Sequence, residues 1–281
     1  MVVAVVAAFE LYSVGLVLLS RRKWGADRLQ LNNEVAGFKF AVIGVLYAVL
    51  LGFVVIAVWE NFRNTEAAVR NEAKAGADLY QLSYAVPEDS GSTIRKSLRD
   101  YAEQVRQSEW PAMARGYPSN IAADALAHLT QSIHDLQTVD FRGLAHYEQA
   151  LRLLAVIGDN RSERLDSANG SVPAILWLVL IAGAMTLLGY PAFFGTSNII
   201  AQTLMTATLA ALVALAVLPA LLLDYPFTGR VRISAAPFRQ ALQEQIPPHA
   251  KGEGPGESEQ SNATRREPAE ADDGKPRHSQ P

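Results

Sequence analysis

Four long apolar blocks alternate with polar sequence along the chain. The blocks cover residues 2–19, 38–58, 173–194 and 199–223. About 20 apolar residues in a helix cross the ~30 Å hydrocarbon core of a bilayer, so each block is long enough to span it. Basic residues follow the first block instead of preceding it, which favours a retained helix over a signal peptide. The pattern predicts four transmembrane helices, with both ends of the chain on the same side of the membrane as the polar insert of residues 59–172.

The second apolar block has two distinct faces when it is drawn as a helix. Small residues recur on one face: Gly37, Ala41, Gly44, Ala48 and Gly52. Small residues let helices approach closely, so this face is predicted to serve helix packing, within the bundle or between copies. The adjacent face carries Val45, Val49 and Phe53. In an oligomer packed around an axis, these three side chains would line a pore, and such apolar constrictions can gate by dewetting.

No helix breaker follows the second block. Trp59 and Glu60 stand where the helix leaves the membrane, and Trp at this depth usually anchors a helix at the interface. Apolar positions then recur at helical spacing as far as Tyr84. We therefore predict that the second transmembrane helix continues into the polar insert and couples the two parts mechanically.

The rest of the insert is predicted to be helical. Pro87 and Gly91 break the long helix, and Ser92 is positioned to cap a second helix that Pro111 or Gly116 ends. Ser119 caps a third helix, and Asp140 starts a fourth. No stretch alternates with period two, so no sheet is expected. The predicted fold class is an all-α integral membrane protein with four transmembrane helices and an all-helical soluble insert between the second and the third.

The domain plan follows from these boundaries. It comprises a first helix with a basic loop, a second helix, the insert, a closing helix pair, a juxtamembrane segment and a disordered tail, at residues 1–32, 33–58, 59–172, 173–223, 224–246 and 247–281. The tail is rich in Pro, Gly, Glu and Ser without an apolar period, so it cannot bury enough surface to offset the entropy of ordering.

Composition excludes several kinds of chemistry. The chain has no cysteine, which rules out disulfides, thiolate catalysis and Cys-based zinc sites. The net charge of −3 argues against a nucleic-acid partner. No phosphate-binding glycine loop, HExxH pair or nucleophile elbow occurs. We therefore expect no enzymatic activity, no cofactor and no metal.

Glu10 is the one acid near the middle of an apolar block. A charge there costs on the order of 3 kcal/mol on insertion scales, so intramembrane acids are candidates for function. The alternative is that Glu10 stays protonated or reaches a polar neighbour.

Three separated motifs resemble one known family. The motifs are GVLYAVLLGFVVIAVWENF, EWPAMARG and LLLDYPFTGRVRISAAPF, in this order along the chain. They are similar to a bacterial bestrophin-like membrane family of unknown function, over most of residues 33–238, with the first helix and the tail outside. That family is a distant relative of the bestrophins, which are pentameric anion channels with cytosolic helical domains.

The resemblance implies roles for several residues. Val45, Val49 and Phe53 match the three bulky apolar residues that ring the bestrophin neck, although two of them are valines and therefore smaller. The turn after the last helix is similar to an acidic-Pro-Phe-Gly turn on the cytosolic side of bestrophins, and its residues here are Asp224, Pro226, Phe227 and Gly229. An acid in this turn can cap a helix or contact an ion. The acid-rich calcium clasp of animal bestrophins has no clear counterpart, so no calcium is expected.

Charge alone leaves the orientation open. Five basic residues lie on the side of the loop between the first two helices, three of them adjacent at residues 21–23, and eight are spread over the other side. The resemblance favours the larger total. It places the insert and the tail in the cytoplasm of a bacterium, with the helices in the inner membrane. The resulting hypothesis is a homo-oligomer, a pentamer by resemblance, that conducts small anions. The alternative is a non-conducting membrane scaffold or stress sensor whose helical domain binds a protein partner.

Overall fold

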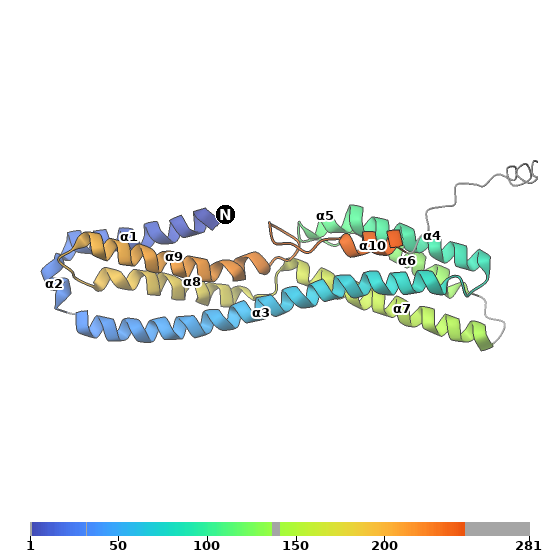
Figure 1. Ribbon diagram of the computed structural model, residues 1–281, viewed down its shortest axis with the longest axis horizontal. Helices are drawn as coiled ribbons and strands as arrows, with labels where there is room; N and C mark the ends of the chain where they lie inside the picture. Colours follow the sequence, from blue (N-terminus) through green and yellow to red (C-terminus); the bar gives the residue numbers. More distant parts are fainter. Residues whose placement is uncertain (1, 32, 137–140, 245–281) are drawn as a thin grey trace, which may run out of the picture. The chain divides into compact units, whose positions relative to one another are not determined.

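A computed structural model describes residues 2–31, 33–136 and 141–244 of the chain. These residues fold into helices joined by short connections, and no β-strand occurs among them (Figure 1). The expected start of a helix at Asp140 and the expected disordered tail lie outside the described residues. The all-α prediction is confirmed.

Four helical stretches are long and apolar enough to cross a membrane. The first is α1 (Val2–Trp24), the second lies in α3 (Asn33–Leu82), the third is α8 (Ala174–Gly189) with the short 3₁₀ helix η3 (Tyr190–Phe193), and the fourth is α9 (Ile199–Leu223). A short helix α2 (Ala26–Gln30) joins α1 to α3. The side chain of Asn198 caps α9 by accepting from the N–H groups of Ile200 and Ala201, which closes the tight hairpin between α8 and α9.

The helix α3 is continuous over 50 residues. At 1.5 Å per residue it is about 75 Å long, more than twice the thickness of a bilayer core. Its first part packs against α8 and α9, and its second part packs along α7 (Phe141–Asp166) (Figure 1). The prediction that the second transmembrane helix runs unbroken into the insert is confirmed.

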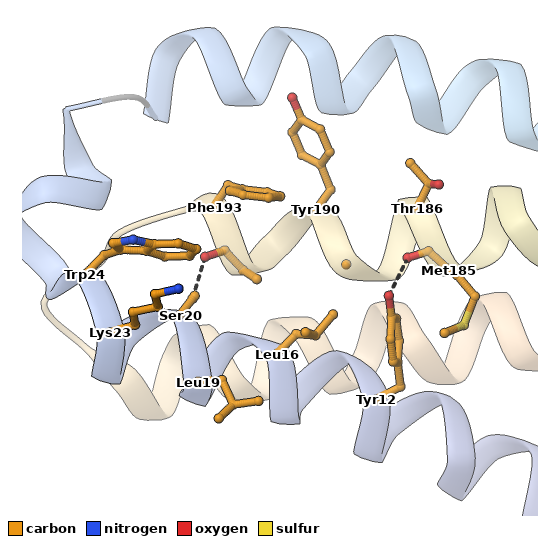
Figure 2. Close-up of a pocket in the computed structure, with 12 residues that line it drawn as sticks. Tyr12, Leu16, Leu19, Ser20, Lys23, Trp24, Met185, Thr186, Tyr190 and Phe193 are labelled. Atoms are coloured by element: carbon orange, nitrogen blue, oxygen red, sulfur yellow. Dashed lines mark hydrogen bonds between the residues drawn. The ribbon is translucent and has the colours of Figure 1, made fainter.

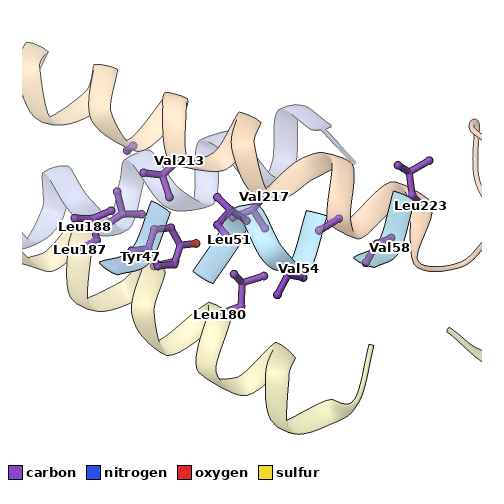
Figure 3. Packing of buried hydrophobic residues seen from close by; sticks show 13 residues of the cluster. Tyr47, Leu51, Val54, Val58, Leu180, Leu187, Leu188, Val213, Val217 and Leu223 are labelled. Atoms are coloured by element: carbon purple, nitrogen blue, oxygen red, sulfur yellow. The ribbon is translucent and has the colours of Figure 1, made fainter. Parts of the chain in front are cut away.

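The core of the membrane bundle is formed by α3, α8 and α9. Tyr47, Leu51, Val54 and Val58 of α3 lie against apolar side chains of the other two helices (Figure 3). Gly183 of α8 makes a close contact in this core, since a Cβ atom there would lie 2.8 Å from Cδ2 of Tyr47. Glycine is therefore needed at this position for the aromatic ring to reach the helix backbone.

The insert contains α4 (Glu88–Gln104), α5 (Trp110–Met113), α6 (Asn120–His134) and α7. Ser119 caps α6 as expected, since its side chain accepts from the N–H of Ala122. The expected cap at Ser92 is wrong, because α4 begins at Glu88 directly after Pro87. Gly91 does not break a helix but lies inside α4, where a Cβ atom would overlap the carbonyl oxygen of Ser83.

A π-helical turn, η1 (Val105–Glu109), connects α4 to α5. Pro111 lies in the first turn of α5, where a missing N–H group costs little, so the chain stays helical through the proline. The helical run ends at Gly116, whose φ of 81° is readily adopted only by glycine. Of the two residues expected to end this helix, it is Gly116 that does so. Single π-turns inside helices are frequent at functional sites.

Candidate functional site

The three candidate pore-lining residues share one exposed face of α3. Val45, Val49 and Phe53 are 65%, 54% and 69% exposed. The same face continues in both directions with other exposed apolar side chains. We call the set of Phe38, Val42, Val45, Val49, Phe53 and Ile56 the open face of α3. It lies on the opposite side of the helix from the buried row that begins at Tyr47, so no part of the described chain covers it.

The row of small residues divides between two environments. Gly37 and Gly44 face the bundle, where a Cβ atom would lie 4.0 Å from Phe194 and 3.9 Å from Leu187 respectively. The other three residues of the row, Ala41, Ala48 and Gly52, are exposed. Within one chain, the row therefore brings α3 close to the bundle only at Gly37 and Gly44.

Glu10 lies half-buried on α1. The polar residues after it bond to the backbone of α8: the hydroxyl of Tyr12 donates to the carbonyl of Met185 at 3.2 Å, and Ser13 donates to that of Leu188 at 2.7 Å. These two bonds fix α1 against α8 at the depth where Glu10 lies.

The candidate residues at the membrane exit do not form one cluster. Trp59 and Glu60 of α3 are exposed, and so is Gly229, which turns the chain with a φ of 74°. Asp224, Pro226 and Phe227 are buried instead. The turn after α9 thus faces the protein interior, while the exit of α3 faces outward.

Asp224 ties the end of α9 to the start of α8. Its Oδ1 accepts from the N–H groups of Ser171 and Val172 at 2.8 and 3.0 Å, and its Oδ2 accepts from Nε1 of Trp177 at 3.0 Å. The carboxylate is 1% exposed. An acid in this turn can cap a helix or contact an ion, and the geometry of Asp224 is that of a cap. The N–H groups that it accepts from belong to residues just before α8, not to α9.

The second and third family motifs meet in space. The Trp110 ring lies edge-on to Phe227, with the centroids 5.5 Å apart, and it also contacts Phe238. Nε1 of Trp110 donates to the carbonyl of Ile233 at 3.3 Å. The helix α10 (Ala236–Glu244), which carries Phe238, is thereby held against the insert. Trp110 therefore joins the insert to the segment that leaves the membrane.

A buried ionic network lies beside Trp110. The guanidinium of Arg164 binds both oxygens of Glu72 at 2.8 and 3.0 Å and one oxygen of Glu109 at 2.7 Å. All three side chains have an exposed fraction of 0%. Arg161 adds a second ion pair to Glu109 at 2.5 Å, so two acids balance two bases. We call these four residues the Arg164 network, which connects α3, η1 and α7.

Tyr101 completes the hydrogen bonding of the Arg164 network. Its hydroxyl donates to Glu72 at 2.5 Å. Burial, and then the neighbouring charge of Glu72, raises the pKa of Tyr101 well above its usual range. The phenol therefore stays protonated and remains a donor. The Arg164 guanidinium also lies over the ring of Trp110, 5.2 Å from its centroid. This contact links the network to the segment after α9, which Trp110 contacts.

The sequence contained a signal for this network that helical periodicity could have revealed. Ala150 and Ile157 are buried on α7 with a spacing of seven, and the next position in that series is Arg164. On α3, Glu72 likewise falls among the buried positions Val69 and Ala73. A charged residue at a core position indicates a partner elsewhere, because a buried charge is costly unless it is paired.

Metal ligation has no support in the described ranges, since no cluster of three or more His, Cys, Asp or Glu side chains in them could hold a metal ion.

Four membrane-length helices, one of them extended into an all-helical insert, define a multi-pass helical membrane protein. The chain belongs to the bestrophin-like domain family, which matches residues 7–238. The family resemblance seen in the three motifs is confirmed, and the matched region is larger than expected because it includes most of the first helix.

Solved structures show the same fold at low sequence identity. A bacterial bestrophin homologue from Klebsiella pneumoniae has a TM-score of 0.61 at 15% identity, and the match covers 88% of this chain and 100% of that one. A single-residue variant of a bestrophin homologue from the same organism has a TM-score of 0.64 at 16% identity, over 87% and 98% of the two chains. No curated protein sequence matches the chain.

Proposed function

We propose that this protein is a homo-oligomeric channel for small anions, with α3 lining the axis. The observation that carries the proposal is the open face of α3, a row of large apolar side chains that no part of the described chain covers. Membership of the bestrophin-like domain family supports it. A pentamer is the subunit number that the family resemblance favours.

The spacing of the candidate residues suits a constriction. Val45, Val49 and Phe53 are four residues apart, so in an axial assembly they would form three rings about 6 Å apart along the helix. Rings of apolar side chains can close a pore by excluding water without closing it sterically. Phe53 is the largest of the three, and its ring would be the narrowest. Ala41, Ala48 and Gly52, which are exposed in one chain, would let neighbouring copies approach closely.

The proposed location is the bacterial inner membrane, with the insert and the C-terminal region in the cytoplasm. The family resemblance and the larger number of basic residues on the insert side support this orientation. A reporter fused to the C-terminus tests it, since activity of a periplasm-only reporter such as alkaline phosphatase would contradict the cytoplasmic placement. The proposal includes no catalytic residue, cofactor or metal.

Halide flux from liposomes that contain the purified protein tests conduction. We expect flux from the wild type and increased flux from Phe53→Ala, because the variant widens the proposed constriction. Leu212→Ala is the matched control, since Leu212 is 61% exposed and lies on α9, outside the open face of α3. A folded oligomer without flux would overturn the channel, and equal flux from the wild type and Phe53→Ala would remove Phe53 from the constriction. A monomer or dimer by mass in detergent would favour the scaffold alternative.

A further inference from the structure

A cavity of about 490 Å³ lies between α1 and the α8–η3 segment. Its walls include Leu16 and Leu19 from α1 and Met185, Gly189 and Phe193 from the other side (Figure 2). The volume falls within the range of about 300–1,000 Å³ that is typical of small-molecule sites. The cavity lies within the membrane-spanning part of the chain, away from the open face of α3.

Three hydroxyl groups of the wall are already bonded to the protein backbone. The Tyr12 hydroxyl donates to the carbonyl of Met185 at 3.2 Å, and Ser20 Oγ donates to that of Ala192 at 2.6 Å (Figure 2). The Thr186 hydroxyl donates to the carbonyl of Ala182 at 2.8 Å. Because these groups are satisfied internally, the wall presents mainly hydrocarbon. A hydrated ion or polar solute would find few hydrogen-bond partners there, whereas an acyl chain has no hydrogen bonds to lose on entering the cavity.

One end of the cavity has a different character. Lys23 and Trp24 lie together there, with the ammonium 5.2 Å from the centroid of the indole ring (Figure 2). No ion pair joins Lys23 to a carboxylate among the residues that the structure describes. Trp is enriched at the membrane–water interface, and a basic residue near the surface attracts anionic lipids.

We propose that this cavity binds an anionic phospholipid, with one acyl chain along the apolar wall that includes Leu19 and Phe193 and the phosphate against Lys23. The apolar wall and the ammonium of Lys23 at the interfacial end match the two halves of such a molecule. Trp24, which is 43% exposed, would lie beside the glycerol region. The site is separate from the proposed pore and does not depend on whether the protein conducts.

Native mass spectrometry of the full-length protein tests the site. The protein is equilibrated with mixed micelles that contain equal amounts of phosphatidylglycerol and phosphatidylcholine, and the retained lipids are counted per chain. We expect the wild type to retain phosphatidylglycerol preferentially. Lys23→Gln should lower that preference about fivefold, because one lysine near an anionic headgroup contributes about that factor. Lys39→Gln is the matched control, since Lys39 is an exposed lysine on α3 outside this cavity, and it should behave as the wild type.

A second variant obstructs the cavity without removing a charge. Leu19 lines the cavity and is 64% exposed, so Leu19→Trp should obstruct the cavity and abolish lipid retention while Lys39→Gln retains it. Equal retention of both lipids, or an unchanged preference in Lys23→Gln, would overturn the proposal. Because the chain has no cysteine, Leu19→Cys reports directly on neighbours. A disulfide between copies at this position, with no lipid retained, would show that a second copy covers the cavity instead.

Discussion

Replacing Arg164 by methionine tests the physical reasoning about the buried ionic network. Methionine keeps most of the side-chain volume and removes the charge. Three hydrogen bonds to the carboxylates of Glu72 and Glu109 are lost at once. Glu109 keeps its ion pair with Arg161, whereas Glu72 keeps only the hydroxyl of Tyr101. The variant therefore leaves one buried carboxylate without a cationic partner.

The expected loss is about 3–5 kcal/mol in the free energy of unfolding, the usual result of removing one partner from a buried ion pair. Most of this loss comes from the uncompensated charge of Glu72, since both side chains of the pair are fully buried. The double variant Arg164→Met with Glu72→Gln should therefore recover part of the loss, because a neutral amide is less costly to bury than a carboxylate. Recovery in the double variant separates the charge effect from a packing effect.

Urea unfolding in detergent micelles, followed by tryptophan fluorescence, measures these free energies. Trp110 is one of four tryptophans in the chain, and its ring centroid lies 5.2 Å from the Arg164 guanidinium, so its surroundings change when the network opens. The matched control is Arg152→Met on the same helix. Arg152 pairs with Glu148 at 3.7 Å, but both side chains are more than half exposed, so the control should lose no more than about 1 kcal/mol. If Arg164→Met is no less stable than Arg152→Met, the network does not hold the insert together.

Three further variants or conditions test other contacts by the same unfolding assay. Asp224→Ala removes the acceptor of Trp177 and of two backbone N–H groups. It should lower the free energy of unfolding by about 3 kcal/mol or more, since a hydrogen bond to a charged group contributes about 1.5–3 kcal/mol. A loss below about 1 kcal/mol would show that these hydrogen bonds are not needed for stability. Gly91→Ala should cost about 1–3 kcal/mol, because the new methyl group overlaps the carbonyl of Ser83, and an unchanged urea midpoint would contradict this contact. The pKa of Tyr101 is raised in the folded state, so the unfolded chain ionises first and the free energy of unfolding should fall as the pH rises above about 10. Between pH 8 and pH 11 we expect a smaller fall in Tyr101→Phe than in the wild type. Equal falls in the two proteins would refute the raised pKa of Tyr101.

The sequence predicted the membrane part of the fold well because one physical requirement dominates there. In a bilayer every backbone polar group must be bonded internally, so a long apolar run is a helix. The fourth block, residues 199–223, coincides with α9, and Asn198 supplies its cap. The continuity of α3 was equally predictable, since it required only the lack of a breaker between Val58 and Pro87.

The insert was harder to predict because tertiary contacts override local signals there. Ser92 is a good cap by composition, yet α4 starts four residues earlier, and Gly91 lies inside it against the carbonyl of Ser83. Proline at position 111 suggested a helix end, yet it lies in the first turn of α5, directly after the π-turn η1, where its missing N–H group costs little. The pairing of Glu72 with Arg164, 92 residues apart, depends on how α3 and α7 are packed, which local patterns do not specify.

The structure also shows which basic residues are informative about the orientation in the membrane. A basic residue that the fold requires at one place would occur there in either orientation, so it carries little information about the side of the membrane. Arg21, Arg22 and Lys23 lie in the last turn of α1, where cations offset the negative end of the helix dipole, and Arg21 also donates to the carbonyls of residues 196 and 197. On the other side, Arg161 and Arg164 are held by buried acids. Apart from these five residues, two basic residues lie on the side of the loop between α1 and α3 and six on the side of the insert. The dense cluster at residues 21–23 is therefore weak evidence against a cytoplasmic insert, and the remaining charges support the orientation proposed above.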